Sequence, residues 1–452
     1  MDTSRSLVVL GLVASLGATP LAGQPNPPPA EQPAAAEVDL GGGTLDRAAL
    51  IQAVLDRNPG LAAARQAWAA ARERIVEAES LDDPMASYGV APLSITSDDA
   101  PFGHQLEVAQ PFPYPGTLRL RGEMAAAEAD AAEQEVEAVR LQLATAASHL
   151  FDDYYRVSRE LAINAEHLRL LRDFQAVAVD RYAAGLAAQQ EPLQAEVEAA
   201  HLLHTEVVLE TERRTISARL NALLHRPPRA PLPPPPADPG LPAPPEETGE
   251  ALAPALASAR PELAAQRAEI AARRTAVALE KLGFYPDFEV MASYNSMWNM
   301  PEHQWMAGVG VNLPLRRRRV RAAVTAAEAR LAAAESELAR LEDEVRAEVE
   351  VAAETLREAL HVVHLYRSRV LPAARDQIAA ARAGFETGAA SMLALIDAER
   401  SLRSAELTHD EALADALSRR AELDRALGRL PFAAAALPAP PPPSSDETET
   451  ER

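Results

Sequence analysis

The sequence predicts a mainly α-helical protein with a small β part, built from long coiled-coil-like helical hairpins and an internal tandem duplication. Three observations support this fold class. A stretch of about 70 residues, Arg316 to Phe385, contains one internal proline and repeats apolar residues every seven positions. A hairpin with matching motifs lies 203 residues earlier. Two pairs of short segments alternate between apolar and polar residues.

The stretch from Arg316 to Phe385 has the pattern of one long helix. At about 1.5 Å per residue it would extend on the order of 100 Å, far more than a globular domain needs. One step of four interrupts the steps of seven, as in a coiled-coil seam with a stutter. Gly384 and Gly388 then break the pattern, which resumes from Met392 to Leu427 and so predicts a hairpin. The seam consists of Val324, Leu331, Leu338, Val345, Val349, Leu356, Val363 and Val370.

The same hairpin occurs earlier in the chain. Tyr182-Ala-Ala-Gly185 matches Phe385-Glu-Thr-Gly388, and Leu193-Gln-Ala-Glu196 matches Ile396-Asp-Ala-Glu399 at the same offset. A gapless match over more than about 40 residues indicates duplication, not chance. We therefore expect a first repeat at 44–226, a proline-rich linker at 227–250 and a second repeat at 251–430.

Both ends of the chain differ in composition from the repeats. Residues 1–23 have the features of a secretory signal peptide, with Arg5, an apolar run from Leu7 to Leu16 and small residues up to Gly23. The next residue is Gln24, not the cysteine of a lipoprotein, so we expect export without lipidation. The proline- and alanine-rich arm 24–43 and the tail 431–452 are typical of disordered chain.

The first repeat opens with two short helices before its long one. Thr44 is suited to cap a helix that begins near Leu45, and Asn58-Pro59 separates this helix from a second one at about 60–80. A long helix is expected from 116 to 184, because apolar residues again recur in steps of seven. These residues are Val136, Leu143, Leu150 and Val157.

Each repeat also contains two segments with the period of a β-strand. In the second repeat, Phe288, Val290, Ala292 and Tyr294 alternate with more polar residues, and Trp305 to Leu313 does the same. Strands of about nine residues with one apolar face and aromatic residues near their ends fit a transmembrane β-barrel. Four strands cannot close a barrel, so several chains would share it. The alternative is a soluble antiparallel sheet with one buried face.

Composition excludes several classes of function. The formal net charge of −22 disfavours nucleic acid and anionic membrane surfaces as primary partners. The chain has no cysteine, which excludes disulfides and thiol chemistry. It also has no nucleophile motif, phosphate-binding loop or recognisable pair of catalytic carboxylates, so we expect neither an enzyme nor a cofactor.

Taken together, these motifs resemble the TolC family of bacterial outer-membrane efflux proteins over roughly Leu45 to Leu430. The resemblance is carried by the two hairpin turns at Gly185 and Gly388, by Tyr285-Pro286-Asp287 before the third strand and by Val311-Asn-Leu-Pro314 after the fourth. It implies a homotrimer in the outer membrane. Each chain would give four strands to one β-barrel, and its long helices would form an α-barrel that extends into the periplasm.

The resemblance also implies a function and a site. The chain would be the passive duct of a tripartite efflux system, working with a periplasmic adaptor protein and an inner-membrane pump of the RND type. The hairpin turns would form the periplasmic tip, where the adaptor docks and the entrance closes. The residues expected there are Arg181, Tyr182, Gly185, Leu186, Phe385 and Gly388.

Two further groups of residues suggest ligands. Met297, Met300 and His303 lie in the loop after the third strand, and thioethers with imidazole suit Cu(I) or Ag(I). With the acidic charge, this loop favours metal ions such as copper over drugs as cargo. The arginines at 316–319 and 321 are either a phosphate-binding anchor at the inner face of the membrane or a solvated helix start. Outer-membrane lipid is therefore a further expected partner.

A second hypothesis comes from another class of protein. Long coiled coils also occur in soluble periplasmic adaptor or scaffold proteins. Such an adaptor should carry a single hairpin flanked by β-rich, lipoyl-like halves, and the strand segments decide between the two hypotheses.

Overall fold

The computed structural model describes residues 40, 43–92, 102–245, 259–298 and 300–432. All of them belong to one structural unit, which spans Asp39–Arg452. The expected signal peptide, nearly all of the expected arm and the tail after residue 432 lie outside the described residues.

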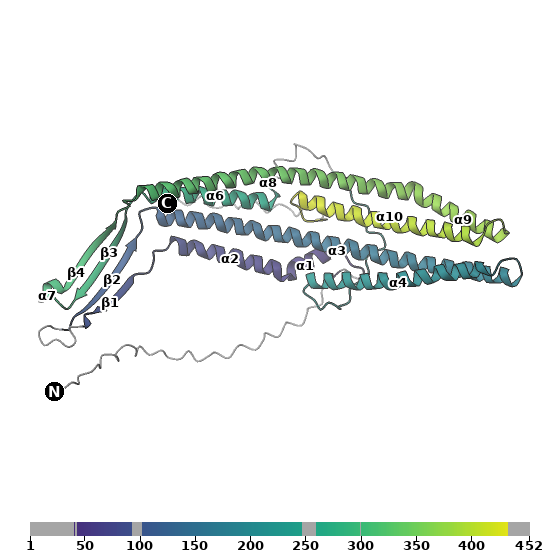
Figure 1. Cartoon of the computed structure of the whole chain (residues 1–452), viewed down its shortest axis with the longest axis horizontal. Coiled ribbons are helices and arrows are strands. Elements are labelled where there is room, and N and C mark those ends of the chain that lie inside the picture. The colour runs from purple at the N-terminus through teal and green to yellow at the C-terminus, as the bar shows by residue number, and fades with distance from the viewer. Residues whose placement is uncertain (1–39, 41–42, 93–101, 246–258, 299, 433–452) are drawn as a thin grey trace, which may run out of the picture. The chain divides into compact units, whose positions relative to one another are not determined.

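Two similar series of elements follow one another along this unit (Figure 1). The first comprises α1 (Arg47–Arg57), α2 (Pro59–Glu79), β1 (Met85–Val90), β2 (His104–Phe112), α3 (Thr117–Ala183) and α4 (Gln190–Leu223). The second comprises α6 (Pro261–Leu282), β3 (Asp287–Asn295), α7 (Pro301–Gln304), β4 (Trp305–Asn312), α8 (Arg317–Leu365), the π-helical turn η3 (Tyr366–Val370), α9 (Leu371–Thr387) and α10 (Met392–Ala426). The helix expected from 316 to 385 is therefore confirmed, with a π-helical turn that joins α8 to α9.

The four strands form one antiparallel sheet in the order β1-β2-β3-β4. The register places Val108 opposite Ala292, and Ala292 opposite Ala307, so the apolar residues of all strands share one face. This face is open in the single chain, where Val309 is 70 % exposed. The described part of the chain therefore does not bury the apolar face of the sheet, as the alternative of a soluble sheet would require. The exposed apolar residues on this face include Tyr88, Leu106, Val108, Val290, Trp305, Val309 and Val311.

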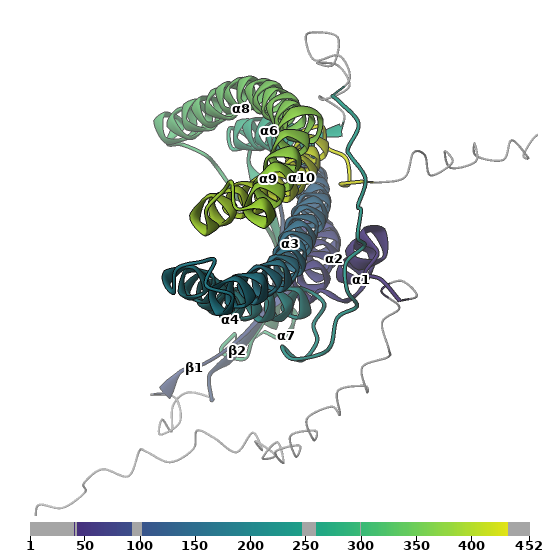
Figure 2. The ribbon, with the colours of Figure 1, turned by 90° about the vertical axis from the view of Figure 1, so that its right-hand side faces the viewer.

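The helices lie side by side in a curved layer (Figure 2). Next to the sheet the packing order is α2, α3, α6 and α8. Toward the hairpin turns it is α4, α3, α10 and then α9, which continues α8. Both orders follow the order of the strands, so one curved surface continues from the sheet into the helices. The helices at the two edges of this layer are α2 and α4 at one edge and α8 and α9 at the other. Within the described unit, each of them packs against neighbours on one side only.

The start of the first repeat differs from the expectation. The side chain that caps α1 is Asp46, which accepts a hydrogen bond from the N–H of Ala49 at 2.7 Å, and not Thr44. The reason is the linker: the N–H of Leu45 donates to the carbonyl oxygen of Pro234 at 2.7 Å, and the Leu45 side chain is buried. This contact holds residue 45 outside the helix.

An equivalent tertiary contact occurs within each of the two repeats. Asn58, before α2, donates its side-chain N–H to the carbonyl oxygen of Leu223 at the end of α4. Arg260, before α6, donates in the same way to the carbonyl oxygen of Ala426 at the end of α10, at 2.9 Å. In each repeat, a side chain at the start of the helix that directly precedes the strands therefore bonds to the end of the returning helix.

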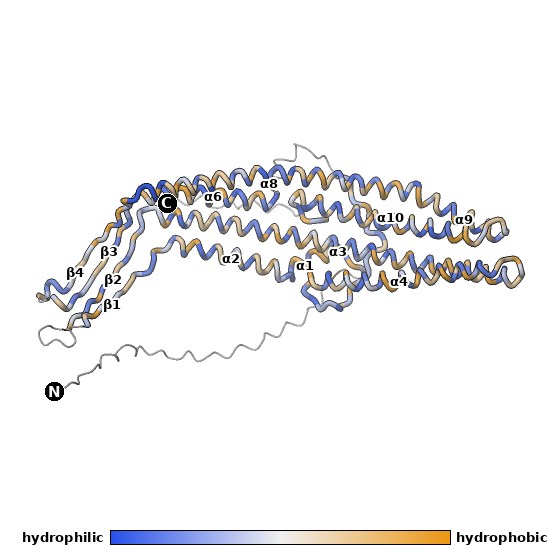
Figure 3. The backbone as a smooth tube through the Cα atoms, in the orientation of Figure 1, coloured by the Kyte–Doolittle hydropathy of each residue, from blue (hydrophilic) through white to orange (hydrophobic). Residues whose placement is uncertain are grey.

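Hydrophilic and hydrophobic residues are interleaved along the helices (Figure 3). No helix in the described ranges combines the length and the apolar content needed to cross a membrane.

Candidate functional site

The two long hairpins turn at the end of the unit opposite the sheet (Figure 1). The first turn passes through Gly185 (φ +70°) and the second through Gly388 (φ +80°). A side chain is unfavourable in this left-handed conformation, which explains the glycines. Each turn closes the last carbonyls of its helix, since Leu186 N–H donates to Arg181 and Ala389 N–H donates to Gly384.

Arg181 connects the two turns. Its guanidinium donates a hydrogen bond to the carbonyl oxygen of Phe385 and lies over the Phe385 ring, 4.6 Å from the centroid. Phe385 itself is 2 % exposed and packs with Met392 and Ile396 of its own hairpin and with Phe174 of the other. The first and second hairpins are thus joined at their tips by a charged cap over an apolar core.

The expected tip residues therefore fall into two groups. Arg181, Phe385 and Gly388 form the contact between the hairpins, with Gly388 lying near the Arg181 guanidinium. Tyr182 and Leu186 instead face solvent, with 46 % and 72 % of their surface exposed. Their role in docking an adaptor or in closing an entrance stays a prediction.

Above the tips, a buried charged cluster joins α3 to α10. Both ring nitrogens of His167 contact carboxylates, Nδ1 with Glu399 at 2.8 Å and Nε2 with Glu406 at 3.0 Å. Because a carboxylate accepts hydrogen bonds, both nitrogens must donate and the ring is charged. Burial by itself lowers the pKa of His167, but the two glutamates outweigh this effect and raise the pKa to about 9.

The cluster extends to α4 through two arginines of α10. Glu198, which is buried, accepts hydrogen bonds from Arg400 and from Arg403, the latter at 2.9 Å. The hydrogen bond from Arg400 is the main cause of the lowered pKa of Glu198. Arg403 also lies 3.4 Å from Glu399, so the charges alternate from α4 through α10 to α3. This cluster fixes the second hairpin against the first.

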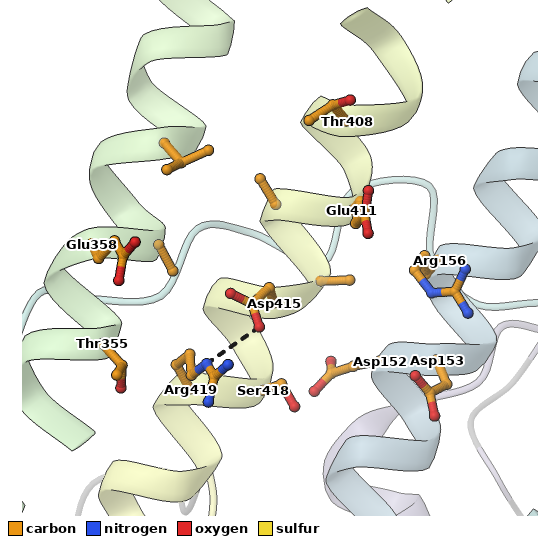
Figure 4. Close-up of a pocket in the computed structure, with 14 residues that line it drawn as sticks. Asp152, Asp153, Arg156, Thr355, Glu358, Thr408, Glu411, Asp415, Ser418 and Arg419 are labelled. Carbon is orange, nitrogen blue, oxygen red and sulfur yellow. Dashed lines mark ion pairs between the residues drawn. The ribbon is translucent and has the colours of Figure 1, made fainter. Parts of the chain in front are cut away.

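An acidic pocket lies higher up, among α3, α8 and α10 (Figure 4). Its volume is about 490 Å³. The carboxylates outnumber the two arginines, Arg156 and Arg419, so the pocket favours cations over anions. Burial raises the pKa of Asp152 to about 6, although the charge of Arg47 beside it acts in the opposite direction. The acidic lining residues are Asp152, Asp153, Glu358, Glu411 and Asp415.

The residues of the expected metal loop lie at the other end of the unit. Met297 follows β3, Met300 precedes α7 and His303 lies within α7, and all three are exposed. The His303 ring contacts Trp298 edge-on, with centroids 5.9 Å apart. Among the described residues, no three His, Asp or Glu side chains come together as metal ligands. Binding of a soft metal by this loop stays a prediction.

Sequence reasoning missed both the charged cluster and the acidic pocket. His167 and Glu399 are separated by 232 positions, and neither belongs to a short motif. One signal was available in the sequence. Glu198 and Glu399 are charged residues among the apolar positions that their helices bury, and a buried charge requires a partner.

The same architecture occurs in solved structures of bacterial channels. The outer membrane protein VceC from Vibrio cholerae matches with a TM-score of 0.70 and 21 % identity over 85 % of this chain and 96 % of that one. A membrane protein from Pseudomonas aeruginosa matches with a TM-score of 0.73 and 20 % identity, over 85 % of this chain and 90 % of that one. CusC, whose structures were described in relation to folding and transmembrane channel formation, matches with a TM-score of 0.71 and 18 % identity. The match covers 85 % of this chain and 92 % of CusC.

The fold is therefore that of the outer-membrane channel proteins, with long helical hairpins and four strands per chain. Residues 252–429 match the family model described as outer membrane efflux protein. This match covers the second repeat of the chain and agrees with the resemblance of its motifs to the TolC family. Proteins of this family are channels and not enzymes. No curated protein matches the chain by sequence at a significant level.

Proposed function

We propose that the chain is the outer-membrane duct of a tripartite efflux system and conducts its cargo passively. The observation that carries this proposal is the open apolar face of the four-stranded sheet at one end of helices of up to 67 residues. Such a face is stable in contact with lipid, and a long helical layer behind it bridges a compartment. The match of residues 252–429 to the family model described as outer membrane efflux protein supports the same function.

Three copies of the chain would complete the structure. Strands β1 and β4 are the edges of the sheet, and three sheets of four strands give a closed barrel of twelve. The helical layer has matching open edges. Helix α4 exposes Leu193, Val197, Val207 and Val208, and α8 exposes Val351, so α4 of one copy is suited to pack against α8 of the next.

The partners and cargo follow from the two ends of the duct. We propose that the exposed tip residues Tyr182 and Leu186 meet a periplasmic adaptor, which connects the duct to an inner-membrane pump of the RND type. The acidic pocket and the exposed Met297, Met300 and His303 support a cationic cargo, with metal ions such as copper preferred over drugs. The division into repeats at 44–226 and 251–430 belongs to the same proposal.

The alternative of a soluble periplasmic adaptor finds no support. The described residues contain two helical hairpins and one exposed sheet in place of the single hairpin with β-rich halves that an adaptor requires.

Envelope fractionation and electrophoresis test the proposal. The full chain should be recovered in the outer membrane and should migrate as a trimer when unheated and as a monomer after heating. The extracted trimer should also conduct ions across a planar bilayer. Recovery of a monomer in the soluble periplasmic fraction would contradict the proposed duct.

A further inference from the structure

A second pocket lies where the sheet meets the helices, and its volume is about 570 Å³. Three arginines line it: Arg121 comes from α3, and Arg316 and Arg319 come from the start of α8. The two acidic residues in the lining are Glu280 and Asp287. Three guanidinium groups against two carboxylates leave an excess of positive charge in the lining, and Asp287 accepts a hydrogen bond from the N–H of Tyr114 at 2.9 Å.

The side chains of these arginines form no ion pair in the described part of the chain. Nearby basic residues do have one, since Arg119 pairs with Glu123, and Lys281 with Glu328. The side chains of Arg121, Arg316 and Arg319 form no such ion pair with any described residue, and the same holds for Arg317, Arg318 and Arg321 next to them. The five arginines at 316–319 and 321 repel one another unless an anion lies between them.

The backbone around the pocket adds to this preference for an anion. The pocket lies at the N-termini of α3 and α8, which have no side-chain cap and no acidic residue in the first turn. The C-terminus of α6 also lines the pocket, but N–H groups of Gly283, Phe284 and Tyr285 satisfy its last carbonyls. The positive ends of two helix dipoles and three arginines therefore adjoin the same space, an arrangement suited to phosphate oxygens.

An apolar surface lies directly beside the charged one. Leu313 and Leu315, between β4 and α8, are 61 % and 85 % exposed. Tyr285 stacks on Tyr114 at the same level, with ring centroids 4.5 Å apart. An amphiphile fits this combination, with acyl chains along the leucines and its charged group among the arginines.

We propose that this pocket binds a phosphate group, supplied by the headgroup of a phospholipid in the inner leaflet of the outer membrane. The inference rests on the proposed function, because a headgroup reaches the pocket only if the sheet spans that membrane. Of the two interpretations of the arginines at 316–319 and 321, this proposal takes the headgroup anchor for Arg316 and Arg319, which line the pocket. Free phosphate has the same oxygen chemistry and is the other source to be tested.

The test compares the wild-type chain with two triple variants of equal charge. The site variant is Arg121→Gln, Arg316→Gln and Arg319→Gln. The control is Arg330→Gln, Arg367→Gln and Arg369→Gln, which changes arginines with no ion-pair partner among the described residues and no place in the pocket. Native mass spectrometry of the detergent-extracted protein with added phosphatidylglycerol measures retained lipid, and titration calorimetry with inorganic phosphate measures the second source.

The expected result is lipid retention by the wild type and the control, with at least about tenfold weaker binding by the site variant. Equal retention by all three proteins, or an equal loss in both variants, would overturn the phosphate site. Binding of inorganic phosphate without lipid retention would overturn the phospholipid as source. Heat-sensitive migration of each variant is measured in parallel, so a failure of the duct itself is seen separately as loss of the trimer.

Discussion

Arg181 of α3 donates a hydrogen bond to the carbonyl oxygen of Phe385 in α9 and covers its ring, although Phe385 occupies the position equivalent to Tyr182 in the other repeat. The two equivalent aromatic residues thus have opposite environments. Phe385 is 2 % exposed and Tyr182 is 46 % exposed. The duplication supplied two aromatic tips, of which one became the core of the contact between the hairpins and the other remained on the surface.

This asymmetry predicts different costs for the same substitution. Phe385→Ala should destabilise the tip by about 3–5 kcal/mol, because it leaves a cavity among Phe174, Met392 and Ile396. Tyr182→Ala should cost less than about 1 kcal/mol. Hydrogen exchange of the amides near residues 174–186 measures the difference, and equal protection in the two variants would contradict the assignment.

The charged cluster predicts a stability that depends on pH. The pKa of His167 is raised from 6.5 to about 9, so the folded state binds this proton more tightly than the unfolded state. The stabilisation, on the order of 3 kcal/mol, is fully present below about pH 6.5 and is lost as the pH rises through about 9.

Thermal unfolding between pH 6 and pH 10 checks this sign. The wild type should lose more stability over this range than His167→Gln, which cannot carry the charge. Glu198, Arg400 and Arg403 remain in both proteins and serve as the internal reference. Parallel pH profiles for the two proteins would show that His167 does not carry the dependence.

Two glycines with similar backbone angles should respond differently to alanine. At Gly185 (φ +70°) a new Cβ would meet no other atom within 4 Å, so Gly185→Ala should cost only the conformational strain of about 1 kcal/mol. At Gly428 (φ +71°) the new Cβ would lie 2.2 Å from the carbonyl oxygen of Ala259, and backbone atoms cannot yield cheaply. The melting temperature should therefore fall several times further for Gly428→Ala. A smaller fall at Gly428 than at Gly185 would contradict the close approach.

The exposed sheet face predicts a difference between its two sides. Val309→Arg places a charge on the apolar face and should disfavour membrane insertion by about 2–4 kcal/mol. Ser293→Arg places the same charge on the opposite face and should be tolerated. The yield of heat-sensitive trimer in the outer membrane measures the effect of each substitution. If the apolar face instead lines the interior of the barrel, Ser293→Arg should lower the yield and Val309→Arg should be tolerated.

Much of the fold could be predicted because it depends on local patterns. Heptads of valine and leucine specify the long helices, and glycines at 185 and 388 specify the turns through their left-handed conformation. Alternation in residues 287–313 specified the strands and their shared apolar face. The cap of α1 was predicted at Thr44 and lies at Asp46, because the contact of Leu45 with Pro234 depends on a linker nearly 190 residues away.

The candidate site could be predicted only in part for the same reason. Glycines at 185 and 388 identify the turns in the sequence. The contact of Arg181 with Phe385, however, spans 204 positions and depends on how one hairpin packs on the other. The partners of His167 are equally remote and carry no motif. Long-range electrostatic pairing has no periodic signature, so it becomes visible only in the packed structure.

The open edges of the sheet bear on how the protein matures. Within the described part of the chain, no strand pairs with the outer edge of β1 or of β4, which leaves a row of backbone N–H and C=O groups open on each. In hydrocarbon such groups are costly, so an isolated chain has no stable place in the bilayer. For the proposed shared barrel, folding and association are then a single reaction whose yield depends on chain concentration, and any foreign strand of similar length competes for the same edge.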